Sequence, residues 1–245
     1  MNNTNVLATH QRSSRSSIYE DGTYLKNIPD WHSGDAAWKG AHIVRMLEKH
    51  ALHPRSAVDV GCGAGGIIDA VARAFPDCAF EGYDISPQAI DLGLKRNLPN
   101  ASFHLGLPSS TEPKYDLAMA IDVAEHVEDC FGFLRNTAAL APYQIYHIPL
   151  DLSVQVMLRP ERILEVRRVI GHIHSFTLET ALEILDDTGH RVIDWFFTAG
   201  AVELEMQSRK QRLAAIPRRL LFKLNQRMAA RWLGGYSILV LCDAK

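Results

Sequence analysis

The stretch that decides the fold is VDVGCGAGG, residues 58–66, in which a short apolar run leads directly into a series of glycines. The apolar run predicts a buried strand, and the residues after the glycines have the period of a helix. Glycines at such a junction allow a tight turn, and the first N–H groups of the helix are free to bind a ligand. The stretch therefore predicts a strand, loop and helix that bind a small molecule through their backbone.

The glycine spacing fits two kinds of nucleotide-derived cofactor. Gly61, Gly63 and Gly66 satisfy the G-x-G-x-x-G pattern of dinucleotide-binding proteins. Gly61, Gly63 and Gly65 satisfy a second pattern, G-x-G-x-G. Proteins that bind a nucleoside sulfonium use this pattern with an acidic residue before it, and Asp59 stands at that place. The glycines alone leave both cofactors open.

An acid closes the next predicted strand. Asp84 follows the run Phe80-Glu-Gly-Tyr and lies about 20 residues after the first glycine. A carboxylate at that place accepts hydrogen bonds from ribose hydroxyls. Asp84 can also cap the helix that begins near Pro87, and the two roles are compatible. Because both cofactors contain ribose, Asp84 supports a nucleotide-derived ligand without choosing between them.

The whole chain is organised as one α/β domain. Its 245 residues are 47% hydrophobic, which is enough for a single substantial core. Short apolar runs alternate with helical periods, as in parallel strands joined by crossover helices. Strands are expected at 56–60, 79–83, 101–104, 115–121, 143–149, 191–198 and 236–242. Helices are expected from about 33 to 50 and at 65–75, 87–97, 127–140 and 177–188.

Charge and cysteine usage argue against several classes of protein. The formal charge of −2 and the pI of about 6.6 do not suit a protein that coats nucleic acid, so we expect no nucleic acid partner. Four scattered cysteines without a CxxC pair suggest neither a disulfide framework nor a zinc finger. No run approaches the ~20 apolar residues of a membrane span. We therefore expect a cytoplasmic protein that is soluble or at most peripheral.

In its motifs, the chain resembles the class I S-adenosylmethionine-dependent methyltransferases, and within them the group of ubiquinone-biosynthesis O-methyltransferases and related small-molecule enzymes. The motifs are Asp59-Val-Gly-Cys-Gly-Ala-Gly, Tyr83-Asp84-Ile-Ser-Pro, Tyr115-Asp-Leu-Ala, Asp122-Val-Ala-Glu125-His126-Val and Phe176-Thr-Leu-Glu with the later Asp187-Thr-Gly-His. They cover roughly residues 55–198 and the last strand. The resemblance implies a Rossmann-like α/β fold with helices on both faces of a seven-stranded, mostly parallel sheet. The implied strand order is 3-2-1-4-5-7-6, with an antiparallel last strand.

The resemblance also implies a cofactor site for S-adenosylmethionine. The glycines of the loop would hold the methionine portion, Asp59 would orient the turn and the amino group, and Asp84 would bind the ribose diol, with Ile85 against adenine. Family members often place an acid after the third strand, whereas this chain offers only backbone around Leu107. The implied cofactor-binding residues are Asp59, Gly61, Cys62, Gly63, Gly65, Asp84, Ile85, Leu107, Asp122 and Val123.

The parts outside the core are predicted from composition and sequence pattern, and the resemblance adds a lid over the cofactor before the first helix. We expect a disordered N-terminus at 1–18, an arm with a lid helix at 19–54, a core at 55–198 with 235–245, and insertions at 151–175 and 199–234. The insertions are expected to form the acceptor pocket or a face toward a membrane or partner, the first being helical and the second irregular and basic. Aromatic residues of the arm either shield the cofactor or pack on the domain; they are Tyr19, Tyr24, Trp31 and His32.

The segment after the fourth strand holds groups suited to catalysis. Asp122, Glu125 and His126 would share one face if the chain turns helically there. They could bind a metal, line the pocket or cap a helix, and we favour pocket lining and assign no metal ligand. A hydroxyl acceptor requires a base, for which His147, at a strand's carboxyl end, and His126 are the first candidates. His172 and His174 are either substrate-binding or ordinary loop residues.

A basic stripe is predicted near the C-terminus. Arg219, Lys223, Arg227 and Arg231 recur every four residues beside apolar side chains, so a helix over Arg218–Trp232 could contact an anionic membrane or lipid-linked substrate. The same pattern fits basic residues on an ordinary packed helix. Oligomeric state is left open.

The predicted function is methyl transfer from S-adenosylmethionine to a small or lipid-linked acceptor, most simply at oxygen. Two alternatives stand beside it. A nicotinamide-dependent oxidoreductase would use the dinucleotide spacing of the glycines, and a non-catalytic protein would bind the cofactor without turnover.

Overall fold

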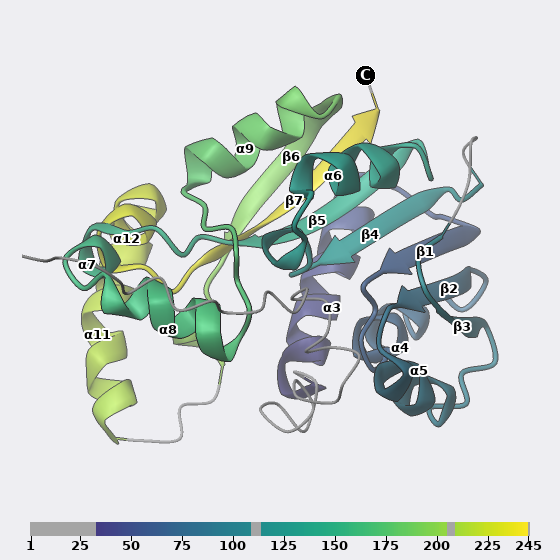
Figure 1. Cartoon of the computed structure of the whole chain (residues 1–245), viewed down its shortest axis with the longest axis horizontal. Coiled ribbons are helices and arrows are strands. Elements are labelled where there is room, and N and C mark those ends of the chain that lie inside the picture. Colours follow the sequence, from purple (N-terminus) through teal and green to yellow (C-terminus); the bar gives the residue numbers. More distant parts are fainter. Residues whose placement is uncertain (1–32, 109–113, 205–208, 245) are drawn as a thin grey trace, which may run out of the picture.

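The computed structural model describes residues 33–108, 114–204 and 209–244. Its centre is one seven-stranded sheet in the order β3-β2-β1-β4-β5-β7-β6 (Figure 1). The strands are β1 (Ser56–Val60), β2 (Ala79–Asp84), β3 (Ala101–Leu105), β4 (Leu117–Ile121), β5 (Tyr143–Pro149), β6 (His190–Thr198) and β7 (Ser237–Ala244). β7 is antiparallel to both of its neighbours, whereas the other neighbouring pairs are parallel. The predicted fold, strand order and antiparallel last strand are confirmed.

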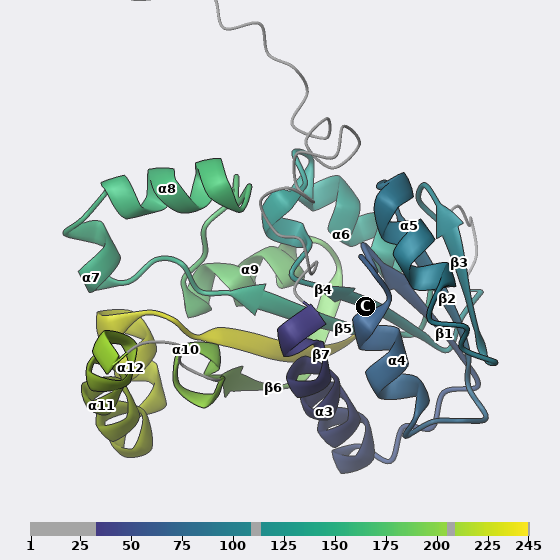
Figure 2. The same ribbon diagram turned by 90° about the horizontal axis from the view of Figure 1, so that it is seen from below.

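Helices cover both faces of this sheet (Figures 1 and 2). α3 (Ser33–Lys49) and α4 (Gly66–Ala72) pack together on one face, while α6 (Cys130–Ala138) and α9 (Leu178–Asp187) lie on the other. α5 (Pro87–Leu94) packs against β2 and β3. Each helix start has a local cause where the chain provides a cap: the Ser86 hydroxyl caps α5, and α9 begins with a capping box.

Two large clusters and one small cluster of buried side chains form the core. The α4 cluster includes Ile68 and Phe80, and the α9 cluster includes Tyr146 and Leu185. Alternate residues of β7 enter opposite clusters, because successive side chains of a strand point to opposite faces. This double burial explains why β7 and β4 are continuous apolar runs rather than alternating ones.

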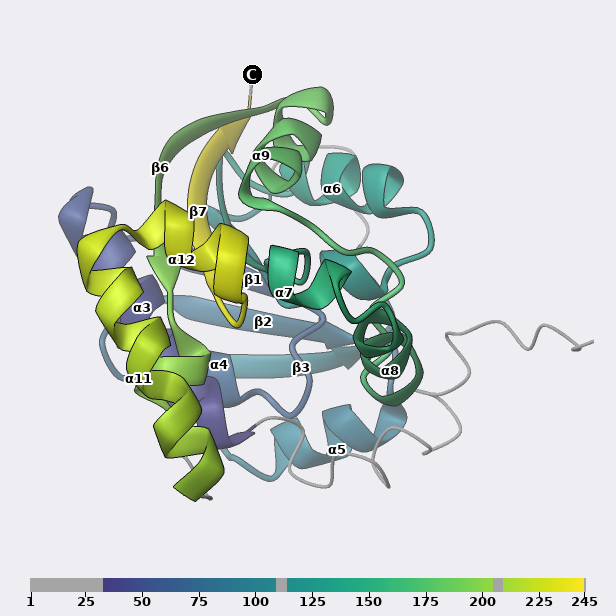
Figure 3. The same ribbon diagram turned by 90° about the vertical axis from the view of Figure 1, so that its left-hand side faces the viewer.

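The two insertions gather at one end of the sheet, on the left in Figure 1 and toward the viewer in Figure 3. α7 (Val154–Met157) and α8 (Glu161–Val169) follow β5, and α10 (Gly200–Glu203), α11 (Arg209–Leu224) and α12 (Gln226–Leu233) lie between β6 and β7. α7 packs against α12, so the insertions touch each other.

Two expectations for the second insertion are wrong. The stretch 199–234 is helical over most of its described residues rather than irregular. A single helix over Arg218–Trp232 does not form either, because α11 ends at Leu224 and the Asn225 side chain accepts a hydrogen bond from the Met228 N–H to begin α12. The basic stripe is therefore divided between two helices.

Other expectations need a boundary change or fall outside the described chain. The helix expected at 127–140 begins at Cys130, and the single 3₁₀ turn η1 (Ala124–His126) precedes it. The N-terminus that is expected to be disordered, at 1–18, lies outside the described residues. So do the aromatic residues of the arm, which are Tyr19, Tyr24, Trp31 and His32. Among the helices of the described ranges, none combines the length and apolar character needed to cross a bilayer.

Candidate functional site

The glycine loop lies at the carboxyl ends of β1 and β2. Gly61, Gly63 and Gly65 all have positive φ values, of 79°, 52° and 71°. A Cβ atom on Gly61 would come within 2.6 Å of the Val123 side chain, and one on Gly65 within 2.5 Å of the Phe103 ring. These positions therefore require glycine for both backbone conformation and space. Val123, a predicted cofactor residue, forms one wall of the loop.

Asp84 fixes this loop to the end of β2. Its carboxylate accepts the Gly63 N–H at 2.9 Å through one oxygen and the Ser86 N–H at 2.8 Å through the other. Each oxygen keeps a second lone pair for an outside donor such as a ribose hydroxyl. Ile85 next to it is half-buried, and Leu107, beyond the end of β3, is 63% exposed. The residues predicted to contact ribose and adenine therefore lie at the carboxyl ends of two neighbouring strands, β2 and β3.

Asp59 is a buried carboxylate without a counter-charge. Its side chain is 1% exposed, and neither oxygen has a hydrogen-bond partner among the described residues. Burial, with the nearby Asp84 charge, raises the pKa of Asp59 to about 7. Such a group needs a proton or a cationic partner to be accommodated. The site therefore fits the amino group of a methionine portion, and Cys62, buried beside it, adds only an apolar wall.

A buried polar chain links the N-terminal helix to two strands. The Lys39 ammonium of α3 lies 2.7 Å from one Asp122 oxygen, and His147 Nδ1 lies 2.5 Å from the other. His147 Nε2 lies 2.8 Å from the Thr198 hydroxyl. Burial alone would raise the pKa of Asp122, but the neighbouring His147 and Lys39 hold it well below its usual range. An ionised Asp122 accepts the Nδ1–H of His147, and His147 Nε2 faces the Thr198 hydroxyl.

These buried polar contacts change the roles expected for Asp122 and His147. Asp122 has φ +55°, which interrupts any helical turn, so Asp122 does not share a face with Glu125 and His126 as the spacing suggested. His147 is 3% exposed, and both of its ring nitrogens contact protein groups. Strained backbone held by a charged network is typical of functional sites.

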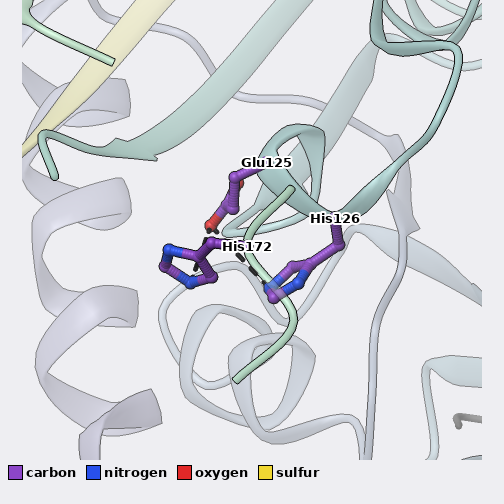
Figure 4. A group of neighbouring side chains, drawn as sticks. All are labelled: Glu125, His126 and His172. Atoms are coloured by element: carbon purple, nitrogen blue, oxygen red, sulfur yellow. Dashed lines mark ion pairs between the residues drawn. The ribbon is translucent and has the colours of Figure 1, made fainter. Parts of the chain in front are cut away.

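A second cluster lies beside these buried polar contacts and consists of Glu125, His126 and His172 (Figure 4). The Nε2 atoms of both histidines lie 4.0 Å from the same Glu125 oxygen, Oε1. Glu125 is fully buried, and neither of its carboxylate oxygens has a hydrogen-bond partner among the described residues. Burial, with Asp122 nearby, raises the pKa of Glu125 well above its usual value. His172 Nδ1 is 2.6 Å from the carboxylate of Asp151, the first residue of the first insertion.

The residues predicted to hold the cofactor gather around the glycine loop, whereas part of the other half of the site has no signal in the sequence. Lys39 and Thr198 carry no local signal, because a lysine in a helix and a threonine ending a strand are common. Asp151 did have a signal, since it follows the carboxyl end of β5, where open α/β sheets present groups to ligands. His172 was predicted to be either a substrate-binding or an ordinary loop residue, and its approach to Glu125 could not be foreseen from spacing.

Comparison with known proteins places these features among methyltransferases. A family model described as a methyltransferase domain matches residues 58–142. Trans-aconitate 2-methyltransferase of Rhodococcus jostii is 31% identical over 71 residues, covering 29% of this chain and 28% of that enzyme. Ajmaline N-methyltransferase of Rauvolfia serpentina is 27% identical over 141 residues, covering 50% of this chain and 47% of that enzyme. The chain thus spans between a quarter and a half of the length of these relatives.

Solved structures match the fold over most of the chain. The complex between the Haloferax volcanii Trm112 methyltransferase activator and a putative methyltransferase gives a TM-score of 0.63 at 15% identity, covering 95% of this chain and 98% of the other. Magnesium protoporphyrin IX methyltransferase from Synechocystis PCC 6803 with bound SAH gives 0.60 at 16% identity, covering 94% and 98%. At these identities the likeness shows the fold.

Proposed function

We propose that this chain contains a class I methyltransferase domain whose cofactor is S-adenosylmethionine, and that it transfers the methyl group to an oxygen of a small or lipid-linked acceptor. The observation that carries the proposal is the position of Glu125, His126 and His172 between the cofactor half of the sheet and the first insertion. Two imidazoles and a carboxylate there suit the removal of a proton from a hydroxyl.

The residues of the first half would hold and orient the cofactor, which supplies an electrophilic methyl group on a sulfonium. Asp84 would bind the ribose diol while keeping the Gly63 loop in place, and Asp59 would bind the amino group. Methyl transfer is an in-line displacement, so alignment of the acceptor with this methyl group is the main contribution of the protein. The chain Lys39–Asp122–His147 would fix the floor of the site.

The acceptor proton would leave at the Glu125 cluster rather than at His147. His126 was one of two predicted bases, and it lies in this cluster with His172. His147, the other predicted base, has both nitrogens directed at protein groups, which supports a positioning role. The relatives are named for trans-aconitate and ajmaline, which supports a small acceptor without selecting its atom. The comparisons give no support to an oxidoreductase or a non-catalytic protein.

Calorimetry and a transfer assay test this function together. We expect S-adenosylmethionine and S-adenosylhomocysteine to bind with micromolar affinity and NAD not to bind. Labelled methyl groups should then reach hydroxyl or carboxylate compounds in a panel that also contains amines and thiols. A preference for NAD would make the proposed reaction wrong. Binding without transfer to any acceptor would favour a non-catalytic protein, and transfer to amines alone would contradict the oxygen acceptor.

We also propose a peripheral membrane contact through α11 and α12, in a form different from the predicted stripe. Arg219 donates to the Val202 carbonyl and Arg231 to Glu179, so these two guanidiniums are partly engaged within the protein. The α11 surface instead presents a row of exposed apolar side chains at helical spacing: Leu213, Ile216, Leu220 and Leu224. Residues 206–242 contain no acidic residue, so this apolar row lies in a basic stretch suited to anionic lipid.

Vesicle sedimentation tests the membrane contact. Vesicles with anionic lipid should retain the protein, and the double substitution Leu220→Ser and Leu224→Ser should weaken vesicle binding more than about 100-fold, because each leucine contributes about 1.5–3 kcal/mol when buried and tenfold in affinity is about 1.4 kcal/mol. Leu94→Ser is the matched control, since Leu94 is 57% exposed on α5 and Leu220 59% exposed on α11. Equal binding of all three proteins would remove the proposal.

A further inference from the structure

We propose that Lys39 is a positioning residue for the cofactor, and that it acts through Asp122 and Val123 on the glycine loop instead of touching the cofactor itself. The inference rests on the proposed function, because it concerns how the proposed S-adenosylmethionine site is held in shape. Three features of the described residues carry it: a buried ammonium between two carboxylates, a strained residue that this ammonium holds, and a side chain that packs against the loop.

The first feature is the environment of the Lys39 ammonium. It lies 2.8 Å from an Asp35 oxygen and 2.7 Å from an Asp122 oxygen, and its side chain is 12% exposed. Burial alone would lower the pKa of Lys39, but the Asp122 and Asp35 charges raise it above its usual value. An ammonium that is removed from water depends on its charged partners, so Lys39 and Asp122 keep a fixed arrangement.

The second feature is the backbone of Asp122. Its φ of +55° lies in the left-handed region, which residues other than glycine adopt at a cost in free energy. Three contacts hold it there. The Asp122 N–H donates to the His147 carbonyl at 3.0 Å, and the carboxylate contacts both His147 Nδ1, at 2.5 Å, and the Lys39 ammonium. Lys39 is the partner that comes from α3, whereas His147 belongs to β5, which is paired with the strand before Asp122.

The third feature is the residue that follows Asp122. Val123 packs directly against Gly61, the first glycine of the loop, because a Cβ atom at Gly61 would come within 2.6 Å of one Val123 methyl carbon and 3.0 Å of the other. Gly61 in turn donates its N–H to the Tyr83 carbonyl at 2.8 Å. Since the φ of Asp122 sets the direction in which the chain continues, a change at Asp122 would shift Val123 relative to the loop.

α3 is itself fixed at this point by a second contact. The indole N–H of Trp38, the residue before Lys39, donates to Glu203 of α10 at 2.8 Å. On the other side of the site, His147 Nε2 lies 2.8 Å from the Thr198 hydroxyl, at the end of the strand that leads into α10. α3 lies between the insertions and α4 (Figures 1 and 2), so it joins the second insertion to the wall of the glycine loop.

A direct contact with the cofactor is the alternative role for Lys39. An ammonium has three N–H donors, and the two carboxylates account for two of them, so in that role the third would contact an anionic group of the cofactor. A double variant separates the two roles. If Lys39 acts through Asp122, removal of both groups costs no more affinity than removal of either one. If Lys39 touches the cofactor, the two losses multiply.

The test is calorimetry of S-adenosylhomocysteine binding to the full chain, which needs no acceptor. Lys39→Met and Asp122→Asn should each weaken binding about tenfold, and the double variant should bind within about threefold of Lys39→Met. Urea unfolding gives a second readout. The double variant should regain part of the stability that Lys39→Met loses, while its affinity for S-adenosylhomocysteine stays low. A merely structural role of Lys39 would restore both together.

Lys49→Met is the matched control. Lys49 ends the same helix and lies 2.6 Å from Asp194 of the edge strand β6, so the substitution removes the same charge and one ion pair, but from a side chain that is 57% exposed. The control should bind S-adenosylhomocysteine within about twofold of the wild type. The proposal would be overturned if Lys39→Met binds as tightly as Lys49→Met, or if the loss in the double variant is the product of the two single losses.

Asp122→Asn keeps the test decisive if Lys39→Met alone does not fold. Asparagine keeps the shape of the side chain and also adopts positive φ, and circular dichroism verifies that each variant is folded. Asp122→Asn and the double variant should then bind within about threefold of each other, and a larger difference would contradict the proposal. A wild-type protein that does not bind S-adenosylhomocysteine would contradict the proposed function, whereas equal binding by the wild type and all variants would contradict only the role of Lys39.

Discussion

Replacing Asp84 by alanine is expected to weaken S-adenosylmethionine binding about 100-fold, because the carboxylate holds the glycine loop and is proposed to bind the ribose. The substitution removes the acceptors of the Gly63 and Ser86 N–H groups. Hydrogen bonds to a charged acceptor contribute about 1.5–3 kcal/mol each, and tenfold in affinity is about 1.4 kcal/mol. Titration calorimetry measures the dissociation constant directly.

Asp91→Ala controls for the loss of one negative charge. Asp91 is exposed on α5, the helix that begins just after Asp84, so its removal changes the net charge by the same amount without touching the loop. The control should bind the cofactor within about twofold of the wild type, as expected for a surface charge in screened solution. An Asp84→Ala protein that is folded and binds as tightly as Asp91→Ala would show that Asp84 does not contribute to the site.

Replacing Lys39 by methionine should lower the free energy of unfolding by about 2–4 kcal/mol. Breaking a buried ion pair costs about 3–5 kcal/mol because it leaves the partner charge unpaired, and the partial exposure of Asp122, 24%, reduces that figure. The Asp35 carboxylate, 2.8 Å from the ammonium, loses the same partner. Urea unfolding followed by circular dichroism gives the change.

The pH dependence gives a second measure of the same pair. The pKa of Asp122 is lowered from 3.8 in the folded chain, so its pairing stabilises the protein fully above about pH 4 and is lost as pH falls further. Lys39→Met should therefore flatten the acid side of the stability curve. Adding Asp122→Asn to Lys39→Met should recover part of the lost stability. If the double variant is less stable than Lys39→Met alone, the unpaired carboxylate is not the cause.

Local patterns identified the fold because its deciding features are local. The glycine loop, the acid that ends β2 and the apolar runs of β4 and β5 are each readable within a few residues. Family resemblance then supplied the strand order, which periodicity alone does not give. The ends of helices were less certain: Asn225 is an evident N-cap signal that divides α11 from α12, yet the regular recurrence of basic residues across it suggested one continuous helix.

The candidate site was harder to predict because its second half depends on contacts between distant segments. Helical spacing grouped Asp122 with Glu125 and His126, but the positive φ of Asp122 turns its side chain into the Lys39 pair instead. The third member of the cluster, His172, arrives from the first insertion. A single sequence contains no signal for that encounter, because it depends on how the loop after α8 packs against the 3₁₀ turn.

The two large clusters of the core affect which parts of the protein can change without destabilising the others. The α4 cluster supports the strands around the glycine loop and one face of β5 and β7, whereas the α9 cluster supports the other face of β5 to β7 and reaches α12 of the second insertion. Substitutions in regions that share no contacts are close to additive in their effects on stability. We therefore expect substitutions in α12 and in α4 to act independently on stability, so that the insertion end can change while the support of the glycine loop is kept.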